Sequence, residues 1–325
     1  MRFIKIVSVA LALICMLLCF AACNEEPDVT EDVYYTVTFN TAGGTQIDSI
    51  KVLAGSKIGK PADPEKEGYI FSSWKNGTIP WDFASDTVDS DVTLNAVWLD
   101  VRNLFEYRVE DGEAIITGFK GGMTRVETPS VIDGIPVTAI GDYAFDGLNS
   151  EALVEITISE NIKSIGEGAF ANSPSVRIIV EAKPEHIGQK AFLGCEGLER
   201  IELGAGLTEV PFEAFSGCTR LREVILSDTV ERISENAFEL CSSLQNVVAH
   251  ESLRTVEDSA FVDCDALRAV CYYGTAEEWA ETEISDGNHG NDTLRAAKLY
   301  IYSETEPALE GDYWYFSKDG MIRVW

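Results

Sequence analysis

The stretch AFSGCTRLREV, Ala214 to Val224, decides how this chain folds, because it returns along the sequence at a fixed interval. AFLGCEGLERI precedes it, and AFELCSSLQNV and AFVDCDALRAV follow it, each 23 residues from the last. Two earlier Ala-Phe pairs, at Phe145 and Phe170, extend the series with steps of 25 and 22 residues. A period of this size is typical of a solenoid, in which each coil buries its apolar edge against the next.

The residue pattern of each unit predicts one coil of chain, made of a strand, a second extended segment and a compact return segment that leads into the next coil. Ile201 and Leu203 are two residues apart, as in a strand, and Leu207 and Val210 form a second apolar pair three apart. If coils stack at about 4.8 Å, like side chains lie in columns. We expect one column of phenylalanines and one of cysteines: Phe145, Phe170, Phe192, Phe215, Phe238 and Phe261, and Cys195, Cys218, Cys241 and Cys264.

The eight cysteines do not predict a disulfide framework or a zinc site. Three of them lie in the first 23 residues, which leaves five, and no CxxC or Cys/His cluster occurs. Cysteines stacked in neighbouring coils have parallel Cα–Cβ vectors, which suit a disulfide poorly. We therefore expect free, buried thiols in the column.

Composition and charge limit the classes of protein to which this chain can belong. The chain has 325 residues, 46% of them hydrophobic, and a net charge of −29. Without residues 1–22 the balance is 23 basic against 54 acidic residues, or −31. Such a surface repels nucleic acid and anionic lipid, so nucleic acid is excluded as a partner.

The N-terminus predicts export. Arg2 and Lys5 precede an apolar run that ends in FAAC, and the acidic stretch NEEPDVTED follows. This segment resembles a bacterial lipoprotein signal, which implies that residues 1–22 are removed and Cys23 is diacylated; Phe20 stands where that motif usually has Leu. An ordinary signal peptide or an uncleaved anchor remains open. Residues 23–33 read as an acidic tether.

Residues 34–98 change to short alternating strands divided by glycine and proline. The segments VTFNTAGG, GSKIGKPADPEKEGYIFSSWKN, WDF and DVTLNAVW resemble the Listeria-Bacteroides repeat, the internalin B-repeat type. The resemblance implies a small β-grasp-like module that acts as a surface spacer or weak binding unit. Trp74, Trp81 and Trp98 are expected to fill its core rather than to form a ligand platform.

Residues 99–325 resemble the BspA-like leucine-rich repeat proteins. The repeats, the opening sequence FEYRVEDGEAIITGFKGG and the closing sequences YYGTAEEWAETEISDGN, LYIYSETEP and EGDYWYF carry the resemblance. The fold class is therefore a β-dominated α/β chain, a leucine-rich-repeat solenoid preceded by a β-grasp-like module. The resemblance implies a microbial surface protein that acts in adhesion or binding. Trp279, Trp314 and Trp325 are expected to close the last coil.

Catalytic signals are sparse. The three histidines, His186, His250 and His289, carry no nucleophile motif, and a Cys271–His289 pair would lack an orienting group. GSKIGKP has the wrong spacing for a phosphate loop, and Asn291 stands where a calcium loop over Asp286 to Asp292 would need glycine. We predict no enzyme activity, no cofactor and no metal site, with a weak cation site in this loop left open.

A binding face is predicted where side chains flank the inward pair of each strand and so point away from the core. The row comprises Glu155/Thr157, Arg177/Ile179, Arg200/Glu202, Glu223/Ile225, Asn246/Val248 and Ala269/Cys271. From it we select Arg177, Ile179, Arg200, Glu202, Glu223, Ile225, Asn246 and Val248 as contacts for an extracellular protein or glycan. The aliphatic residues are also compatible with plain β-propensity, without a partner. The predicted function is a non-enzymatic, lipid-anchored adhesion or binding protein; a structural spacer, or a hydrolase with a cleft, are the alternatives.

Overall fold

The computed structural model describes residues 32–121, 123–148, 153–287, 290–307 and 311–325. These residues form two compact units, the first from residues up to 64 with 71–97, and the second from 65–70 with 98–325. The predicted signal peptide, Cys23 and the tether up to residue 31 lie outside the described residues.

The first unit is a five-stranded mixed sheet in the order β2-β1-β5-β3-β4. Its core is centred on Trp74, which is almost fully buried and packs edge-on against Phe39 at 5.3 Å between ring centroids. Trp81 packs partly buried against the same core, whereas Trp98 belongs to the second unit. The strands are β1 (Tyr34–Asn40), β2 (Ile50–Leu53), β3 (Tyr69–Asn76), β4 (Ile79–Pro80) and β5 (Val92–Asp100).

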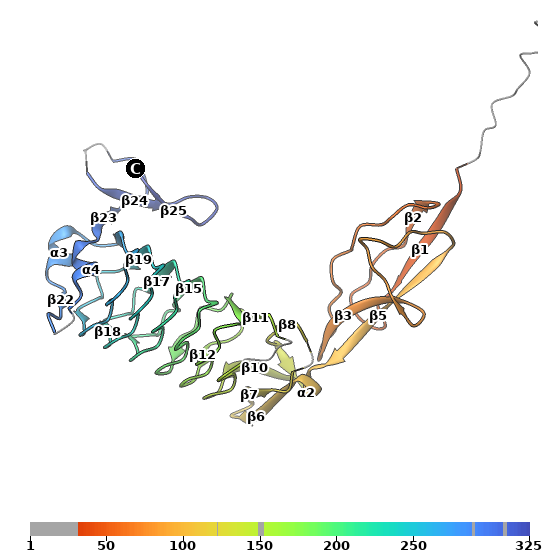
Figure 1. Ribbon diagram of the computed structural model, residues 1–325, viewed down its shortest axis with the longest axis horizontal. Coiled ribbons are helices and arrows are strands. Elements are labelled where there is room, and N and C mark those ends of the chain that lie inside the picture. The colour runs from red at the N-terminus through yellow and green to blue at the C-terminus, as the bar shows by residue number, and fades with distance from the viewer. Residues whose placement is uncertain (1–31, 122, 149–152, 288–289, 308–310) are drawn as a thin grey trace, which may run out of the picture. The chain divides into compact units, whose positions relative to one another are not determined.

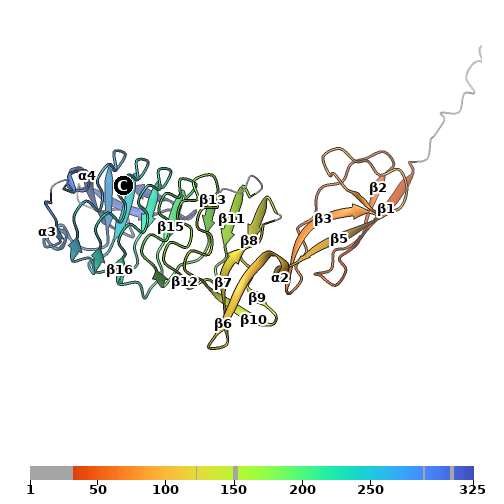
Figure 2. The ribbon, with the colours of Figure 1, turned by 60° about the horizontal axis from the view of Figure 1, so that its bottom comes forward.

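The second unit is a solenoid with a row of parallel strands on each of two faces (Figures 1 and 2). We call the first row the strand face; it comprises β8 (Arg125–Glu127), β11 (Glu155–Ile158), β13 (Arg177–Val180), β15 (Arg200–Glu202), β17 (Glu223–Ile225), β19 (Asn246–Ala249), β21 (Ala269–Tyr272) and β23 (Lys298–Tyr302). The second row comprises β7 (Glu113–Phe119), β10 (Ile135–Ile140), β12 (Ser164–Ile165), β14 (His186–Ile187), β16 (Glu209–Val210), β18 (Arg232–Ile233), β20 (Thr255–Val256) and β22 (Glu283–Ile284). The remaining elements are β6 (Phe105–Glu110), β9 (Val131–Ile132), β24 (Tyr313–Phe316), β25 (Ile322–Val324), α2 (Val101–Leu104), α3 (Ala276–Ala280) and α4 (Asp292–Ala296).

The six phenylalanines of the repeats form a continuous stack. Successive ring centroids from Phe145 to Phe261 lie 4.9, 5.3, 5.4, 5.2 and 5.1 Å apart, and the interplanar angles are between 1° and 19°. The small alanine before each phenylalanine lets the backbones approach. The Phe215 N–H, for example, donates to the carbonyl oxygen of Ala237 in the next coil at 2.8 Å. The stack agrees with the column that the 23-residue period predicts.

The four column cysteines are free and buried, and each thiol has a structural partner. Every Sγ donates to the carbonyl oxygen of the phenylalanine one coil earlier, at 2.9 to 3.2 Å. Ser173 makes the same bond to Phe145 from the equivalent position, at 3.0 Å. Burial raises the pKa of the Cys195, Cys218 and Cys241 thiols, so they remain protonated donors at neutral pH.

The return segment of each coil turns through two left-handed residues, which lie two positions before and two positions after the phenylalanine. Glycine fills some of these positions, but most are occupied by other residues with φ between 52° and 60°. Leu240 is one of them, with a φ of 60° and an exposed side chain. An aliphatic residue in this conformation is strained, whereas Asn or Asp adopts it readily.

The last coil is closed by polar side chains from the segment that begins α4. Asn291 is fully buried, and its Oδ1 accepts from the Phe261 N–H at 3.0 Å, where another coil would have supplied an alanine carbonyl. Thr293 donates from Oγ1 to the Phe261 carbonyl at 2.7 Å and so replaces the thiol of a further coil. Together these two side chains satisfy the backbone groups at the end of the stack.

Candidate binding face

The predicted contact residues lie side by side on four neighbouring strands. Arg177 and Ile179 are on β13, Arg200 and Glu202 on β15, Glu223 and Ile225 on β17, and Asn246 and Val248 on β19. The register pairs Arg200 with Glu223 and Glu223 with Asn246, so the row runs straight across these three strands. The row does not form one exposed surface, because its two halves differ in what covers them.

The C-terminal half of the strand face is covered by the hairpin of β24 and β25 (Figure 1). Val248 and Cys271 are fully buried and Ile225 is 8% exposed, and these side chains form a separate apolar core around Trp314. Trp314 is anchored by a hydrogen bond from Nε1 to the carbonyl oxygen of Tyr272, at 3.3 Å. The prediction that Ile225 and Val248 face a ligand is therefore wrong, because the chain folds back after the last coil and packs on them.

Two further predicted contacts have local roles. Glu223 is 9% exposed, and its Oε1 lies 2.7 Å from Nε of Arg200, so it fixes the arginine instead of meeting a partner directly. Asn246 is half-buried beside the covered patch. The outward direction of both side chains follows from strand alternation, but their accessibility depends on the hairpin.

An aromatic cluster holds the hairpin in place. The Tyr273 ring stacks on His250 at 4.2 Å, lies 4.4 Å from Tyr302 and meets Trp314 edge-on at 5.0 Å. Phe316 packs against the other side of Trp314, also at 5.0 Å. β24 also pairs in parallel with β23, with Trp314 opposite Tyr302, so Trp314 lies beside the last strand of the row and also covers the apolar patch on the strand face.

His250 makes the docking of this cluster sensitive to acid. Burial against Tyr273 lowers the pKa of His250 below its usual 6.5, although the charges of Asp228 and Glu251 oppose the shift. A histidine with a lowered folded-state pKa stabilises the fold above about pH 6.5, and this contribution is lost as pH falls toward the lowered pKa. Because the ring is only half-buried, we expect less than about 1 kcal/mol.

The expected result is that wild type loses more stability than His250→Gln when pH is lowered from 7.5 to 5.5. Urea unfolding of both proteins at the two pH values measures it, since other titrating groups cancel in the comparison. An identical pH dependence of the two proteins would contradict the role of His250.

The N-terminal half of the strand face is open and carries a network of ion pairs between coils. Arg177 lies 2.9 Å from Glu155 and 3.9 Å from Glu199, and Lys183 lies 2.6 Å from Glu202. With the Arg200 pair, every basic side chain in this region is matched by a carboxylate of a neighbouring coil. Ile179 lies half-buried inside this charged frame.

Both rows of strands break between the same two coils, at a seam between β13–β14 and β15–β16. β11 and β13 pair over four residues, but β13 does not pair with β15; its one bridge across the seam joins Ile178 to Leu198, which precedes β15. The seam coincides with the 22-residue step of the repeat: β13 begins seven residues after Phe170, whereas β15 begins eight after Phe192. The stack of phenylalanines continues across the seam, so the strands are left out of register.

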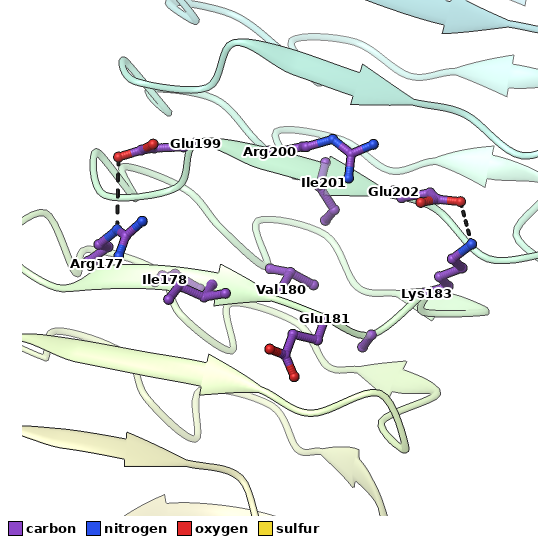
Figure 3. Close-up of a pocket in the computed structure, with 11 residues that line it drawn as sticks. Arg177, Ile178, Val180, Glu181, Lys183, Glu199, Arg200, Ile201 and Glu202 are labelled. Carbon is purple, nitrogen blue, oxygen red and sulfur yellow. Dashed lines mark ion pairs between the residues drawn. The ribbon is translucent and has the colours of Figure 1, made fainter. Parts of the chain in front are cut away.

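The seam opens into a groove on the strand face, with a volume of about 420 Å³ (Figure 3). We call it the seam groove; it is lined by Arg177, Ile178, Ile179, Val180, Glu181, Ala182, Lys183, Glu199, Arg200, Ile201 and Glu202. A second hollow of about 350 Å³ lies at the same seam between β14 and β16. In the sequence, the 22-residue step from Phe170 to Phe192 marks the place of the seam.

Two glycines allow the coils to approach at either end of β15. A Cβ on Gly197 would lie 2.0 Å from the carbonyl oxygen of Val176, and one on Gly204 would lie 2.2 Å from that of Lys183. Any side chain there would force the backbones apart. Close backbone contacts at Gly197 and Gly204 thus hold the two coils together at both ends of the seam groove, while its middle remains open.

The remaining candidates for chemistry do not assemble into a centre. His186 is exposed on β14, and His289 lies outside the described residues. Of the loop from Asp286 to Asp292, Asn291 uses its amide to close the solenoid, and Asp286 pairs with Arg295 at 2.5 Å. Within the described ranges no group of three His, Cys, Asp or Glu side chains is arranged for a metal ion. In that same part of the chain no helix is long and apolar enough to cross a membrane.

Coils of 22 to 25 residues, each with a short strand and a buried Ala-Phe turn, define a leucine-rich-repeat protein. Residues 130–218 match the family model of the BspA type leucine-rich repeat region in six copies, and residues 35–97 match that of the Listeria-Bacteroides repeat domain. Two parts of the chain thus match these two family models, and the fold is a β-dominated leucine-rich-repeat solenoid preceded by a small β module.

Curated relatives share a short segment with this chain. Over 67 residues it is 45% identical to an Evansella cellulosilytica protein named as a Gly-rich membrane protein, covering 20% of this chain and 8% of that one. Over 66 residues it is 41% identical to internalin H of Listeria monocytogenes, covering 19% and 12%. The chain therefore spans about a tenth of the length of these relatives.

Two solved structures are similar to the solenoid. The T. pallidum leucine-rich repeat protein is 28% identical, with 52% of this chain and 68% of that chain covered and a TM-score of 0.36. A leucine-rich cell surface protein from Faecalibacterium prausnitzii is 14% identical, with 57% and 97% covered and a TM-score of 0.28.

Proposed function

We propose that this protein is a non-enzymatic surface protein that binds an extracellular protein through the open half of its strand face. One observation carries the proposal: the outward side chain of Ile179 stays partly exposed in the charged frame of the seam groove. Three strands further on, the protein covers the corresponding apolar patch with its own aromatic hairpin. An apolar patch with a charged rim, left uncovered in this way, is typical of a site that meets a partner.

The proposed attachment to the cell is by lipid. We infer that residues 1–22 are a lipoprotein signal peptide, that Cys23 is diacylated and that residues 23–33 form a tether of up to about 35 Å. Residues 34–98 act as a spacer, and residues 99–325 present the binding face. Replacing Cys23 with alanine is expected to release the protein from the membrane fraction into the medium; retention of the variant would overturn the lipid anchor.

The binding proposal is tested with a double variant of the open face, Arg177→Ser with Ile179→Asp. The matched control is Arg232→Ser with Leu240→Asp, which removes an equally exposed, ion-paired arginine and an exposed aliphatic residue away from the strand face. Asp suits the left-handed conformation at position 240. Far-UV circular dichroism and urea unfolding establish that both variants keep the fold.

The labelled full chain, purified in mild detergent, is applied to arrays of purified extracellular proteins and of glycans. Protein partners that bind wild type and the control but lose at least tenfold in affinity for the double variant support the proposal. Partners that bind all three equally would remove this face from the function. Binding only to glycans would overturn the choice of a protein partner, and no binding at all would favour a structural spacer.

A further inference from the structure

The seam groove has features that define the chemistry of its occupant, given that the open face binds a partner as proposed above. The first is the interrupted ladder. Ile179 and Val180 on one side, and Ile201 and Glu202 on the other, have no paired residue across the seam, although their equivalents at other coils do. Strand edges that lack a neighbour are the places where extended segments of other proteins align.

The second feature is the partly exposed aliphatic side chains of β13. Val180 occupies the position of Leu203 and Leu226 in the next two coils, where the leucine side chains are fully buried. At the seam Val180 is only partly buried, because no strand in register packs beside it. Strand alternation points the Val180 side chain inward, where it packs against the solenoid core, so the outward Ile179 carries the aliphatic surface that an extended peptide can contact.

The third feature is the charge that remains uncompensated in the seam groove. The basic side chains Arg177, Lys183 and Arg200 are each held by a carboxylate of the protein itself. Glu181, at the end of β13, is exposed and has no ion-pair partner among the described residues. Figure 3 shows its carboxylate apart from the paired Glu199 and Glu202. The seam groove therefore presents one carboxylate without an ion-pair partner in the described part of the chain, that of Glu181, next to aliphatic surface.

The carboxylate of Glu127 also indicates that this end of the strand face is acidic. Burial, followed by the charge of Glu181, raises the pKa of Glu127 on β8. A cation placed near Glu181 would relieve this repulsion. The acidic character at this end of the strand face thus extends over more than one coil.

We propose that the seam groove binds an extended peptide segment of a protein partner, with an aliphatic side chain over Ile179 and a lysine or arginine beside Glu181, two residues further along on the same outward side. The volume of about 420 Å³ is in the range of sites that hold a few side chains. The segment lies along the seam between β13 and β15, with its basic residue at the C-terminal end of β13.

The test uses three capped heptapeptides that differ only in their charge. The first has the sequence Ser-Lys-Val-Lys-Val-Lys-Ser, and the other two replace all lysines with serine or with glutamate. Each is titrated into the full chain with labelled isoleucine and valine methyl groups, followed by NMR. The lysine peptide is expected to shift the Ile179 and Val180 methyl signals, the serine peptide to bind several times more weakly, and the glutamate peptide not to bind.

Glu181→Gln is expected to weaken binding of the lysine peptide about fivefold, and raised salt should reduce the difference between the two proteins. Glu196→Gln is the matched control, since it removes an exposed acid of the next coil outside the seam groove, and should leave affinity unchanged. Equal affinity for the three peptides, shifts that avoid Ile179 and Val180, or an unaffected Glu181→Gln variant would each overturn the inference.

The two proposals fail separately. Array partners that depend on Arg177 and Ile179, combined with no binding of the lysine peptide, would overturn the peptide inference and leave the protein-binding face in place. Specific binding of the lysine peptide without any array partner would support the seam groove and count against the proposed surface function.

Discussion

Phe215→Ala is expected to lower the free energy of unfolding of the solenoid by about 3–5 kcal/mol. The Phe215 ring is fully buried and is stacked on both faces, with Phe192 at 5.4 Å and Phe238 at 5.2 Å. Alanine would leave a cavity that the coils cannot close, because the Phe215 N–H and the thiol of Cys241 tie the backbone to its neighbours. The defect lies in the middle of the stack, where two coil interfaces share it.

Urea unfolding followed by far-UV circular dichroism measures this loss. Phe212→Ala is the matched control: the same substitution, three residues away, removes a half-buried ring outside the stack. We expect the control to lose less than about 1.5 kcal/mol. A loss at Phe215 no greater than at Phe212 would mean that the stacked column does not hold the coils together.

Trp314→Ala is expected to detach the C-terminal hairpin and expose the covered half of the strand face. Trp314 is fully buried between Tyr273, Tyr302 and Phe316, and its loss removes about 3–5 kcal/mol from the docking of a two-stranded hairpin that is barely stable alone. Because the six-phenylalanine stack is untouched, the solenoid itself should stay folded.

The reactivity of the Cys271 thiol shows whether the hairpin has detached. In wild type its side chain is fully buried under the hairpin, and burial raises its pKa to about 12, with a smaller contribution from the charge of Glu223. We expect the variant to be alkylated at Cys271 at least tenfold faster at pH 8, as measured by mass spectrometry. The four column cysteines serve as internal controls and should stay protected in both proteins.

Trp325→Ala is the matched variant for this experiment. Trp325 is 44% exposed and stacks on Tyr315 at the outer side of the hairpin, so its loss should change Cys271 reactivity little. A Trp314→Ala protein in which Cys271 remains unreactive would show that the hairpin is held without this side chain.

The covered patch also explains why two of the eight predicted contacts, Ile225 and Val248, were wrong. Strand alternation places Ile225 and Val248 on the outward side, and that direction is correct. The sequence YWYF at Tyr313–Phe316 was interpreted as a cap for the last coil, since a solenoid must close its end. Nothing in its local pattern specifies that Trp314 returns to the strand face, because docking depends on surfaces that are far apart in sequence.

The sequence by itself determined the architecture of the solenoid. A 23-residue period forces equivalent side chains into register, since each coil can bury its apolar edge only against a copy of itself. The same logic placed the thiols of Cys195, Cys218, Cys241 and Cys264 in the interior, without disulfides. These conclusions rest on nearest-neighbour contacts, which repeat along the chain and can be read from its spacing.

Only the tertiary structure decided which part of the strand face is free. The hairpin buries Ile225 and Val248, the strands lose their pairing at the seam and leave the seam groove, and Asn291 closes the last coil with its amide. Each of these features occurs once, where the repeat is interrupted. Whether a side chain is accessible depends on which other segment of the chain packs over it. The periodic sequence specifies which side chains point outward, but not which segment covers them.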